Sequence, residues 1–211
     1  MKRNKVNFPS GKLILEGILA IPDGVGPFPA VVVCHPHPLY GGSMDNNVVN
    51  SLCETLTQTS IAAFKFNFRG VGGSQGKFGR GIGEQQDVEA AISFISTIKE
   101  INPQRLGLVG YSAGAGFGFP LGCKDSRVKA LVAISPPLSM FDFDSLKKCP
   151  KPKSLISGSR DNFTPLKQFL EFCQSLPEPA EYESIEGADH FWWGYESIIA
   201  AKVTAFFAKV L

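Results

Sequence analysis

Short apolar runs rich in β-branched residues alternate along the chain with longer segments whose apolar residues recur at the helical period. A run that is apolar at every position is typical of a parallel strand buried on both faces. The runs predict strands over Leu13–Ile21, Ala30–His35, Ile61–Phe68, Arg105–Val109, Val128–Ile134, Lys153–Ser157 and Glu181–Ile185. The helical segments are Asn46–Thr59, Glu84–Lys99, Ala113–Gly122, Pro165–Gln174 and Phe191–Val210. This alternation predicts an α/β fold in which helices flank both faces of a mostly parallel central sheet.

Three further segments have less regular patterns. The opening MKRNK is interpreted as a short solvated tip, and the run after it as a strand rather than a secretory signal, because Glu16 interrupts it. Residues 69–83, RGVGGSQGKFGRGIG, lack the G-x-G-x-x-G spacing and do not lead straight into a helix. They favour a flexible loop over a nucleotide cradle. Residues 135–152 have no clear element and are too short for an independent lid domain.

Composition narrows the class of protein. The 211 residues fit a single domain, residues 1–211, with 44% hydrophobic and 19% charged residues, as in soluble globular proteins. A net charge of +2 gives no electrostatic reason to expect nucleic acid or a membrane as partner. Five scattered cysteines predict neither disulfides nor a zinc site. We expect a cytoplasmic protein without cofactor, and the sequence leaves open whether it forms a homodimer.

One serine is surrounded by small residues. In the segment GYSAG, Gly110, Ser112 and Gly114 fit the pattern G-x-S-x-G, with an apolar strand before it and a helix-compatible run after it. A sharp turn there would bring its flanking segments close together, so larger side chains would collide. At the start of the helix, the N–H of Ala113 is unpaired and faces any negative charge that forms beside the hydroxyl. Ser112 is therefore the candidate nucleophile.

A serine hydroxyl needs a base within hydrogen-bond reach, and the chain has only three histidines. In the strand–turn–helix version of this chemistry, the partners follow in the order serine, acid, histidine. His35 and His37 precede Ser112, whereas His190 follows it, at the exit of the last predicted strand. His190 is therefore the candidate base.

The acid should lie between serine and histidine, just past the end of a strand. Asp161 in SLISGSRDNFTP meets this requirement and would fix the tautomer of the histidine. Asp142 and Asp144 in MFDFD compete with it, one strand earlier. Asp189 is adjacent to the histidine, which makes it sterically awkward as the orienting group.

The negatively charged oxygen that forms when the serine attacks a carbonyl needs a second backbone N–H donor besides that of Ala113. This donor is expected in the loop HPHPLYGGSMDN, after the strand that ends near His35. Pro36 and Pro38 have no N–H, so His37 or Leu39 must donate, and the distance from the strand end favours His37. The HPH segment could instead bind a metal, but no carboxylate cluster accompanies it, and no metal is expected.

Five segments appear in the order in which α/β-hydrolases carry their motifs: VVVCHPHPLYGGSMDN, FNFRGVGGS, GYSAG, SGSRDNFTP and GADHFWWG. From about Leu13 to the last helix, the chain resembles this superfamily, in particular its small lid-less, dienelactone-hydrolase-like predicted serine esterases. The resemblance implies Ser112 as nucleophile, Asp161 as acid and His190 as base. Because dienelactone hydrolase has cysteine as nucleophile, the resemblance does not extend to its own activity.

The resemblance implies cleavage of carboxylic esters through an acyl-enzyme. Without a lid the site should be an open cleft, so we expect small or short-chain esters as substrates. The aromatic candidates for its wall are Tyr40, Phe78, Tyr111, Phe117, Trp192 and Trp193. A thioesterase, a peptidase or an acyltransferase on the same scaffold is an alternative that the sequence does not separate. An idle binding module is another, although it would be expected to lose one of the three catalytic side chains.

Overall fold

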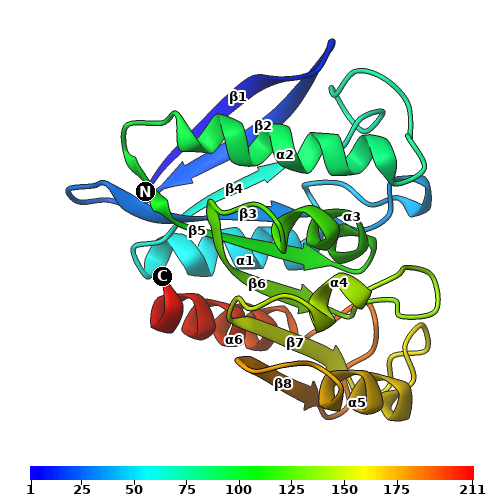
Figure 1. Ribbon diagram of the computed structural model, residues 1–211. Helices are drawn as coiled ribbons and strands as arrows, with labels where there is room; N and C mark the ends of the chain where they lie inside the picture. The colour runs from blue at the N-terminus through cyan, green and yellow to red at the C-terminus, as the bar shows by residue number, and fades with distance from the viewer.

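A computed structural model describes residues 1–211, and one eight-stranded sheet runs through the molecule (Figure 1). Its strands are β1 (Lys2–Ser10), β2 (Leu13–Ile21), β3 (Phe28–Cys34), β4 (Ala62–Phe66), β5 (Ile101–Tyr111), β6 (Val128–Ile134), β7 (Lys153–Gly158) and β8 (Ala180–Ile185). They lie in the order β1-β2-β4-β3-β5-β6-β7-β8. Only the β1/β2 and β2/β4 pairs are antiparallel, so from β4 to β8 all carboxyl ends lie along one edge.

Helices cover both faces of the sheet, as predicted. They are α1 (Asn47–Gln58), α2 (Ile82–Ser96), α3 (Ala113–Gly122), α4 (Asp144–Lys147), α5 (Leu166–Gln174) and α6 (Glu196–Val210), with a 3-10 turn η1 (Pro38–Tyr40). Helices α1 and α6 pack on one face, and α2 to α5 on the other (Figure 1). No helix combines the length and the apolar character needed to cross a bilayer. The predicted α/β fold, with helices on both faces of a mostly parallel central sheet, is confirmed.

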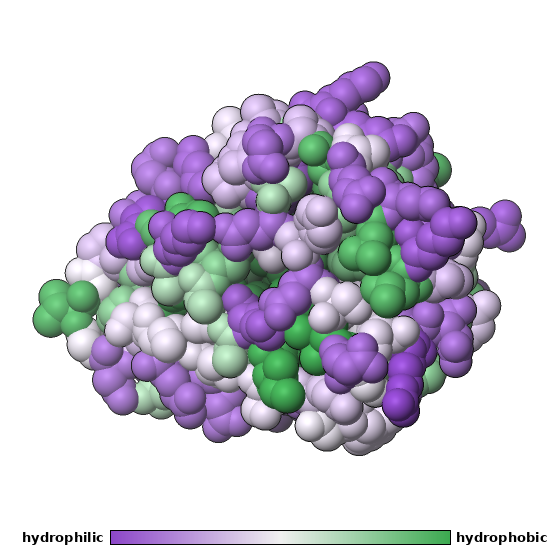
Figure 2. All heavy atoms as spheres, turned by 90° about the horizontal axis from the view of Figure 1, so that it is seen from below, coloured by the Kyte–Doolittle hydropathy of each residue, from purple (hydrophilic) through white to green (hydrophobic).

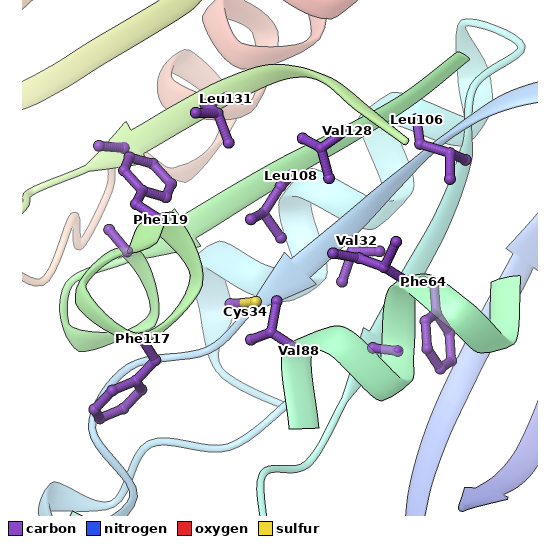
Figure 3. Close-up of a cluster of buried hydrophobic side chains, with 14 of the residues drawn as sticks. Val32, Cys34, Phe64, Val88, Leu106, Leu108, Phe117, Phe119, Val128 and Leu131 are labelled. Carbon is purple, nitrogen blue, oxygen red and sulfur yellow. The ribbon is translucent and has the colours of Figure 1, made fainter. Parts of the chain in front are cut away.

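Each face of the sheet supports its own hydrophobic core. Val32 and Cys34 of β3 point into the core beneath α2 and α3, together with Leu108 of β5 (Figure 3). Val31 and Val33 point into the core beneath α1 and α6. Successive side chains of a strand point to opposite faces, so burial on both faces requires an apolar residue at every position. This requirement explains the unbroken apolar runs of the sequence.

The sequence prediction was wrong at both ends of the chain. The opening residues are not a solvated tip, because Lys2–Ser10 form an edge strand paired antiparallel with β2. An edge strand tolerates charged side chains, so the charged composition of Lys2–Ser10 did not indicate a strand. At the other end, α6 begins at Glu196 rather than Phe191. Trp192 and Gly194 have φ of 62° and 80°, which no α-helix allows.

Charged side chains line both edges of the sheet. On β8, Glu181 and Glu183 pair with Lys209 and Lys202 of α6, each at 2.7 Å. Figure 2, which views the molecule from below Figure 1, shows hydrophilic residues interspersed with smaller hydrophobic patches. Charge on an edge strand opposes pairing with a strand of another molecule. Both edges are therefore poor templates for sheet extension.

The glycine-rich loop, residues 69–83, carries its own hydrogen bonds. The buried Glu84 carboxylate accepts from the N–H groups of Gly79 and Gly81, at 2.8 and 2.7 Å. Because these two backbone donors are bound within the chain, they are not free to hold a phosphate group.

Asp87 ties this loop to α2 and β1. Its side chain is fully buried and accepts from the Ser10 hydroxyl at 2.6 Å and from the Arg69 backbone N–H at 3.0 Å. The Arg69 guanidinium donates to both of its carboxylate oxygens, at 2.8 and 3.0 Å. Removal of one partner of such a pair leaves the other charge buried without compensation.

We therefore expect Asp87→Ala to lower the free energy of unfolding by about 3 kcal/mol. Urea denaturation measures the change, and Glu89→Ala, an exposed carboxylate on the same helix, serves as the control, with an effect of roughly 0.5 kcal/mol or less. Equal stability of Asp87→Ala and Glu89→Ala would show that the hydrogen bonds of Asp87 to Ser10 and Arg69 do not stabilise the fold.

Candidate active site

Ser112 occupies the sharp turn between β5 and α3. Its φ of 54° is unusual for a residue with a side chain, and the turn around it is crowded. A Cβ at Gly110 would lie 2.3 Å from the backbone nitrogen of Ala115, and one at Gly114 would lie 2.3 Å from the carbonyl oxygen of Cys34. The small residues of GYSAG are therefore required by close backbone approach, as the sequence predicted.

The structure brings Ser112, His190 and Asp161 together at the carboxyl edge of the sheet. The hydroxyl of Ser112 lies 2.9 Å from Nε2 of His190. The opposite ring nitrogen, Nδ1, lies 2.9 and 3.1 Å from the two carboxylate oxygens of Asp161. All three side chains are buried although they are far apart in the sequence. The convergence expected from the order serine, acid, histidine is thus present in the geometry.

Asp161 is held as an anion. Its Oδ1 atom accepts from the backbone N–H groups of Phe163 and Thr164, at 2.9 and 3.1 Å. Burial alone would raise the pKa of this carboxyl, but the hydrogen bonds to His190 and to the backbone N–H of Thr164 outweigh burial and hold the pKa below its ordinary value. An ionised carboxylate only accepts hydrogen bonds, so Nδ1 of His190 carries the proton and Nε2 is free to accept from the serine.

The rival carboxylates lie elsewhere. Asp142 and Asp144 are exposed, Asp142 accepts from the backbone N–H of Asp144, and Asp144 pairs with Lys147 at 2.8 Å. Asp189 accepts from backbone N–H groups just after the histidine. None of the three contacts the ring of His190, so the geometry favours Asp161.

Two of the N–H groups proposed from the sequence as oxyanion donors have no acceptor in the protein. The N–H groups of Ala113 and His37 donate to no group of the protein, and both residues line the cleft that contains Ser112. The alternative Leu39 was wrong: its N–H donates to Nδ1 of His37 at 3.1 Å, and its side chain points into solvent.

The cleft around Ser112 has a volume of about 530 Å³, within the range of small-molecule sites. Pro36, His37, Tyr40, Gly41, Gly42, Asn46, Tyr111, Ser112, Ala113, Pro137, Met140, Phe141, Phe163, His190 and Phe191 line it. Lysine, arginine, aspartate and glutamate are absent from this lining. The cleft is thus aromatic and carries no permanent charge at its surface.

Among the aromatic candidates, Tyr40 and Tyr111 line the cleft, and the others do not. Phe117 and Trp192 are fully buried behind it; Phe117 packs edge-on against Phe141, a residue of the wall. Phe78 packs against the ring of His37, with 4.9 Å between ring centroids, and Trp193 lies exposed at the surface. Helical spacing in the sequence does not distinguish a wall residue from the layer that supports it.

Sequence reasoning missed four apolar residues of the wall. Met140 and Phe141 come from the irregular stretch 135–152, and Phe163 and Phe191 come from the loops that carry Asp161 and His190. The ring centroid of Phe163 lies 4.3 Å from that of His190. A usable signal was present, because each of these residues lies in a segment that follows the carboxyl end of a strand.

Comparison with known proteins supports the same picture. A family model described as an alpha/beta hydrolase domain matches residues 30–197. An uncharacterized protein of Rickettsia prowazekii is 35% identical over 172 residues, which make up 78% of this chain and 72% of that protein. The structure of an alpha-beta serine hydrolase homologue from Coxiella burnetii has a TM-score of 0.88 at 29% identity and covers 97% of each chain.

A second solved structure concerns the fold alone, because its identity is 24%. It is an α/β serine hydrolase without lid from Xanthomonas campestris, with a TM-score of 0.88 over 99% of this chain and 95% of the other. The absence of a cap over the cleft is thus matched in a solved structure.

His35 is a structural residue rather than half of a metal pair. Its ring is fully buried, Nδ1 lies 2.6 Å from the carbonyl oxygen of Pro36, and Nε2 accepts from the N–H of Phe68 at 3.1 Å. Because both ring nitrogens are bound within the protein, the ring is neutral and has no free lone pair for a metal. Burial lowers the pKa of His35 to about 4, from an ordinary value of 6.5.

This burial predicts a loss of stability in acid. As the pH falls below about 6.5, the unfolded chain takes up a proton at His35, whereas the folded protein does not until about 4. The free energy of unfolding therefore decreases as the pH falls from about 6.5 to about 4, and His35 does not affect it at higher pH. From pH 7 to pH 4 we expect His35 to account for a loss of roughly 3 kcal/mol in the free energy of unfolding.

Urea denaturation across this pH range measures the loss, and His35→Gln removes the titrating ring. The variant should lose less stability than the parent between pH 7 and pH 4, whatever its stability at pH 7. Parallel curves for the two proteins would contradict the prediction.

Proposed function

The chain belongs to the alpha/beta hydrolase domain family, and from this premise we propose that it is a serine hydrolase that cleaves small or short-chain carboxylic esters through an acyl-enzyme. The proposal is carried by the continuous line of hydrogen bonds from Ser112 through His190 to Asp161, with the hydroxyl facing a cleft. Such a line turns a weakly nucleophilic hydroxyl into a reactive one.

In the first half of the reaction, Oγ of Ser112 attacks the ester carbonyl carbon while its proton passes to Nε2 of His190. The carbonyl electron pair moves onto oxygen, and the N–H groups of Ala113 and His37 are the candidate donors to that oxyanion. Asp161 stabilises the imidazolium as it forms. The C–O bond to the leaving group then breaks, and His190 gives its proton to the departing alcohol.

In the second half, water replaces the alcohol. His190, again neutral, takes a proton from water as the oxygen attacks the acyl carbon, and it returns that proton to Ser112 when the acyl-enzyme breaks. The product is a carboxylic acid and the enzyme is regenerated.

The lining of the cleft supports a preference for small uncharged esters. A charged group entering an aromatic cleft without a countercharge would lose its hydration without compensation. Methylenes beyond the cleft stay in water and contribute no burial energy, and no cap covers them. Added acyl length therefore gains little once the cleft is filled.

Ser112→Ala should abolish covalent labelling by a fluorophosphonate probe, which reacts only with an activated serine. Asp161→Asn should lower kcat for p-nitrophenyl butyrate by about 10⁴-fold, because the histidine then takes the wrong tautomer. Gel fluorescence and absorbance assays measure the two effects.

Asp142→Asn is the matched control, since this exposed carboxylate does not contact His190, and it should label and turn over like the parent. A folded parent that resists the probe would refute the proposed activity. Loss of turnover in Asp142→Asn but not in Asp161→Asn would show that the acid has been misassigned.

A series of p-nitrophenyl esters tests the substrate class. We expect kcat/KM for the butyrate ester to exceed that for the palmitate ester at least about tenfold, because the distal methylenes remain in water. The hemisuccinate ester matches butyrate in acyl length but ends in a carboxylate, and it should also react more slowly. Faster hydrolysis of palmitate, or equal rates for butyrate and hemisuccinate, would show that the cleft has been misinterpreted.

A further inference from the structure

The candidate base follows β8, whereas the nucleophile follows β5, and the strands β6 and β7 lie between them. Because neighbouring strands are about 4.8 Å apart, the loop that carries His190 has to cross roughly 14 Å of sheet to bring its ring to Ser112. The loop therefore passes over the ends of β7 and β6. It keeps this course only where other parts of the protein hold it.

Two contacts hold the loop along the first part of its course. At the end of β7, the backbone N–H of Arg160 donates to the carbonyl of Ala188 at 2.9 Å. At the end of β6, the indole N–H of Trp192 donates to the hydroxyl of Ser135 at 3.1 Å. Neither contact reaches β5, the strand that carries the nucleophile.

The contact with β5 comes from Tyr111, the residue just before the nucleophile. Its hydroxyl donates to the backbone carbonyl of His190 at 2.7 Å, although the two residues are 79 positions apart in the sequence. The main chain of His190 makes no other hydrogen bond within the protein. A single bond from Tyr111 therefore joins the main chain of the base to the strand of the nucleophile.

Burial fixes the direction and the persistence of this bond. A carbonyl oxygen can only accept, so the phenol donates. The ring of Tyr111 lies with Val109 in the core beneath α1 and α6 and is only 2% exposed. Burial, together with the charges of Asp161 and Asp189, raises the pKa of Tyr111. The phenol consequently keeps its proton at neutral pH.

We propose that Tyr111 is a positioning residue of the hydrolase site, whose hydroxyl holds the main chain of His190 where its ring can reach Ser112. The inference rests on the proposed function, because it assigns Tyr111 a role through the base. The bond from Tyr111 to His190 and the 2.9 Å contact between Ser112 and His190 join the same two segments of the chain. The first contact thus keeps the second at the distance that proton transfer requires.

The bond from Tyr111 matters most when the other one is missing. Once Ser112 is acylated, its oxygen has no proton to donate to His190. Asp161 then holds the ring of the base through Nδ1, and Tyr111 holds its main chain. Loss of the phenolic hydroxyl should therefore slow the chemical steps. Substrate binding should change little, because this hydroxyl is already bound to His190.

Tyr111→Phe tests this role, because it keeps the ring in the core and removes only the hydroxyl. We expect kcat for p-nitrophenyl butyrate to fall about tenfold, while KM stays within about twofold of the parent value. Tyr195→Phe is the matched control: Tyr195 packs against the same core shortly after His190, but no hydrogen bond joins its hydroxyl to that residue. Both constants of this control should equal those of the parent.

Hydrogen–deuterium exchange followed by mass spectrometry gives a second readout, which needs no substrate. The N–H groups of Phe191 and Trp192 donate to the Asp189 carboxylate, so a peptide that contains them reports when the loop opens. Exchange in this peptide should be faster in Tyr111→Phe than in the parent, and unchanged in Tyr195→Phe. Urea denaturation establishes that all three proteins are folded under the conditions of the measurement.

Unchanged exchange in Tyr111→Phe, or a kcat equal to that of the parent, would overturn the inference. A raised KM at constant kcat would also overturn it, because the hydroxyl would then act in substrate binding. A parent that cleaves no ester would refute the proposed function instead. Faster exchange in Tyr111→Phe would in that case still support the role of Tyr111 in holding His190.

Discussion

The close approach of backbones around Ser112 is the constraint on which the rest of the site depends. The turn from β5 into α3 passes so near to the end of β3 that a side chain at Gly114 would meet the carbonyls of Cys34 and His35. That contact places the loop after β3 beside the amino end of α3. The unpaired N–H groups of His37 and Ala113 consequently face the same cleft as the serine hydroxyl. Larger residues in GYSAG would separate the nucleophile from its candidate oxyanion donors.

A similar contact joins the acid to the base. A Cβ at Gly158, where β7 ends, would lie 2.2 Å from the carbonyl oxygen of Ala188. The loops that carry Asp161 and His190 therefore pack backbone against backbone, so that their side chains meet at 2.9 Å. Parallel strands bring their carboxyl ends to one edge, but strands have finite width. The missing side chain of Gly158 lets the two loops approach over the remaining distance.

The sequence predicted what depends on periodicity and chain order, and failed where three-dimensional packing decides. Ser112 and Asp161 each follow a buried parallel strand, which the apolar runs predicted. His190 follows the charged edge strand β8 and was inferred instead from chain order and from the scarcity of histidines. The strand Lys2–Ser10 was not predicted, because an edge strand needs little apolar character. Trp192 was expected in the wall but lies beneath it, since composition does not show which way a bulky ring turns at a residue with positive φ.

The way Asp161 is solvated explains why neutral donors surround it. Its only ionic partner is His190, and its other hydrogen bonds come from the backbone N–H groups of Phe163 and Thr164 and from the hydroxyl of Ser157. These donors stabilise the carboxylate but do not cancel its charge, so its field still favours the imidazolium that forms when Ser112 gives up its proton. A lysine or arginine in the place of Ser157 would hold the anion more firmly and would at the same time remove that field. An uncharged donor is therefore the one that stabilises the acid without reducing its effect on the base.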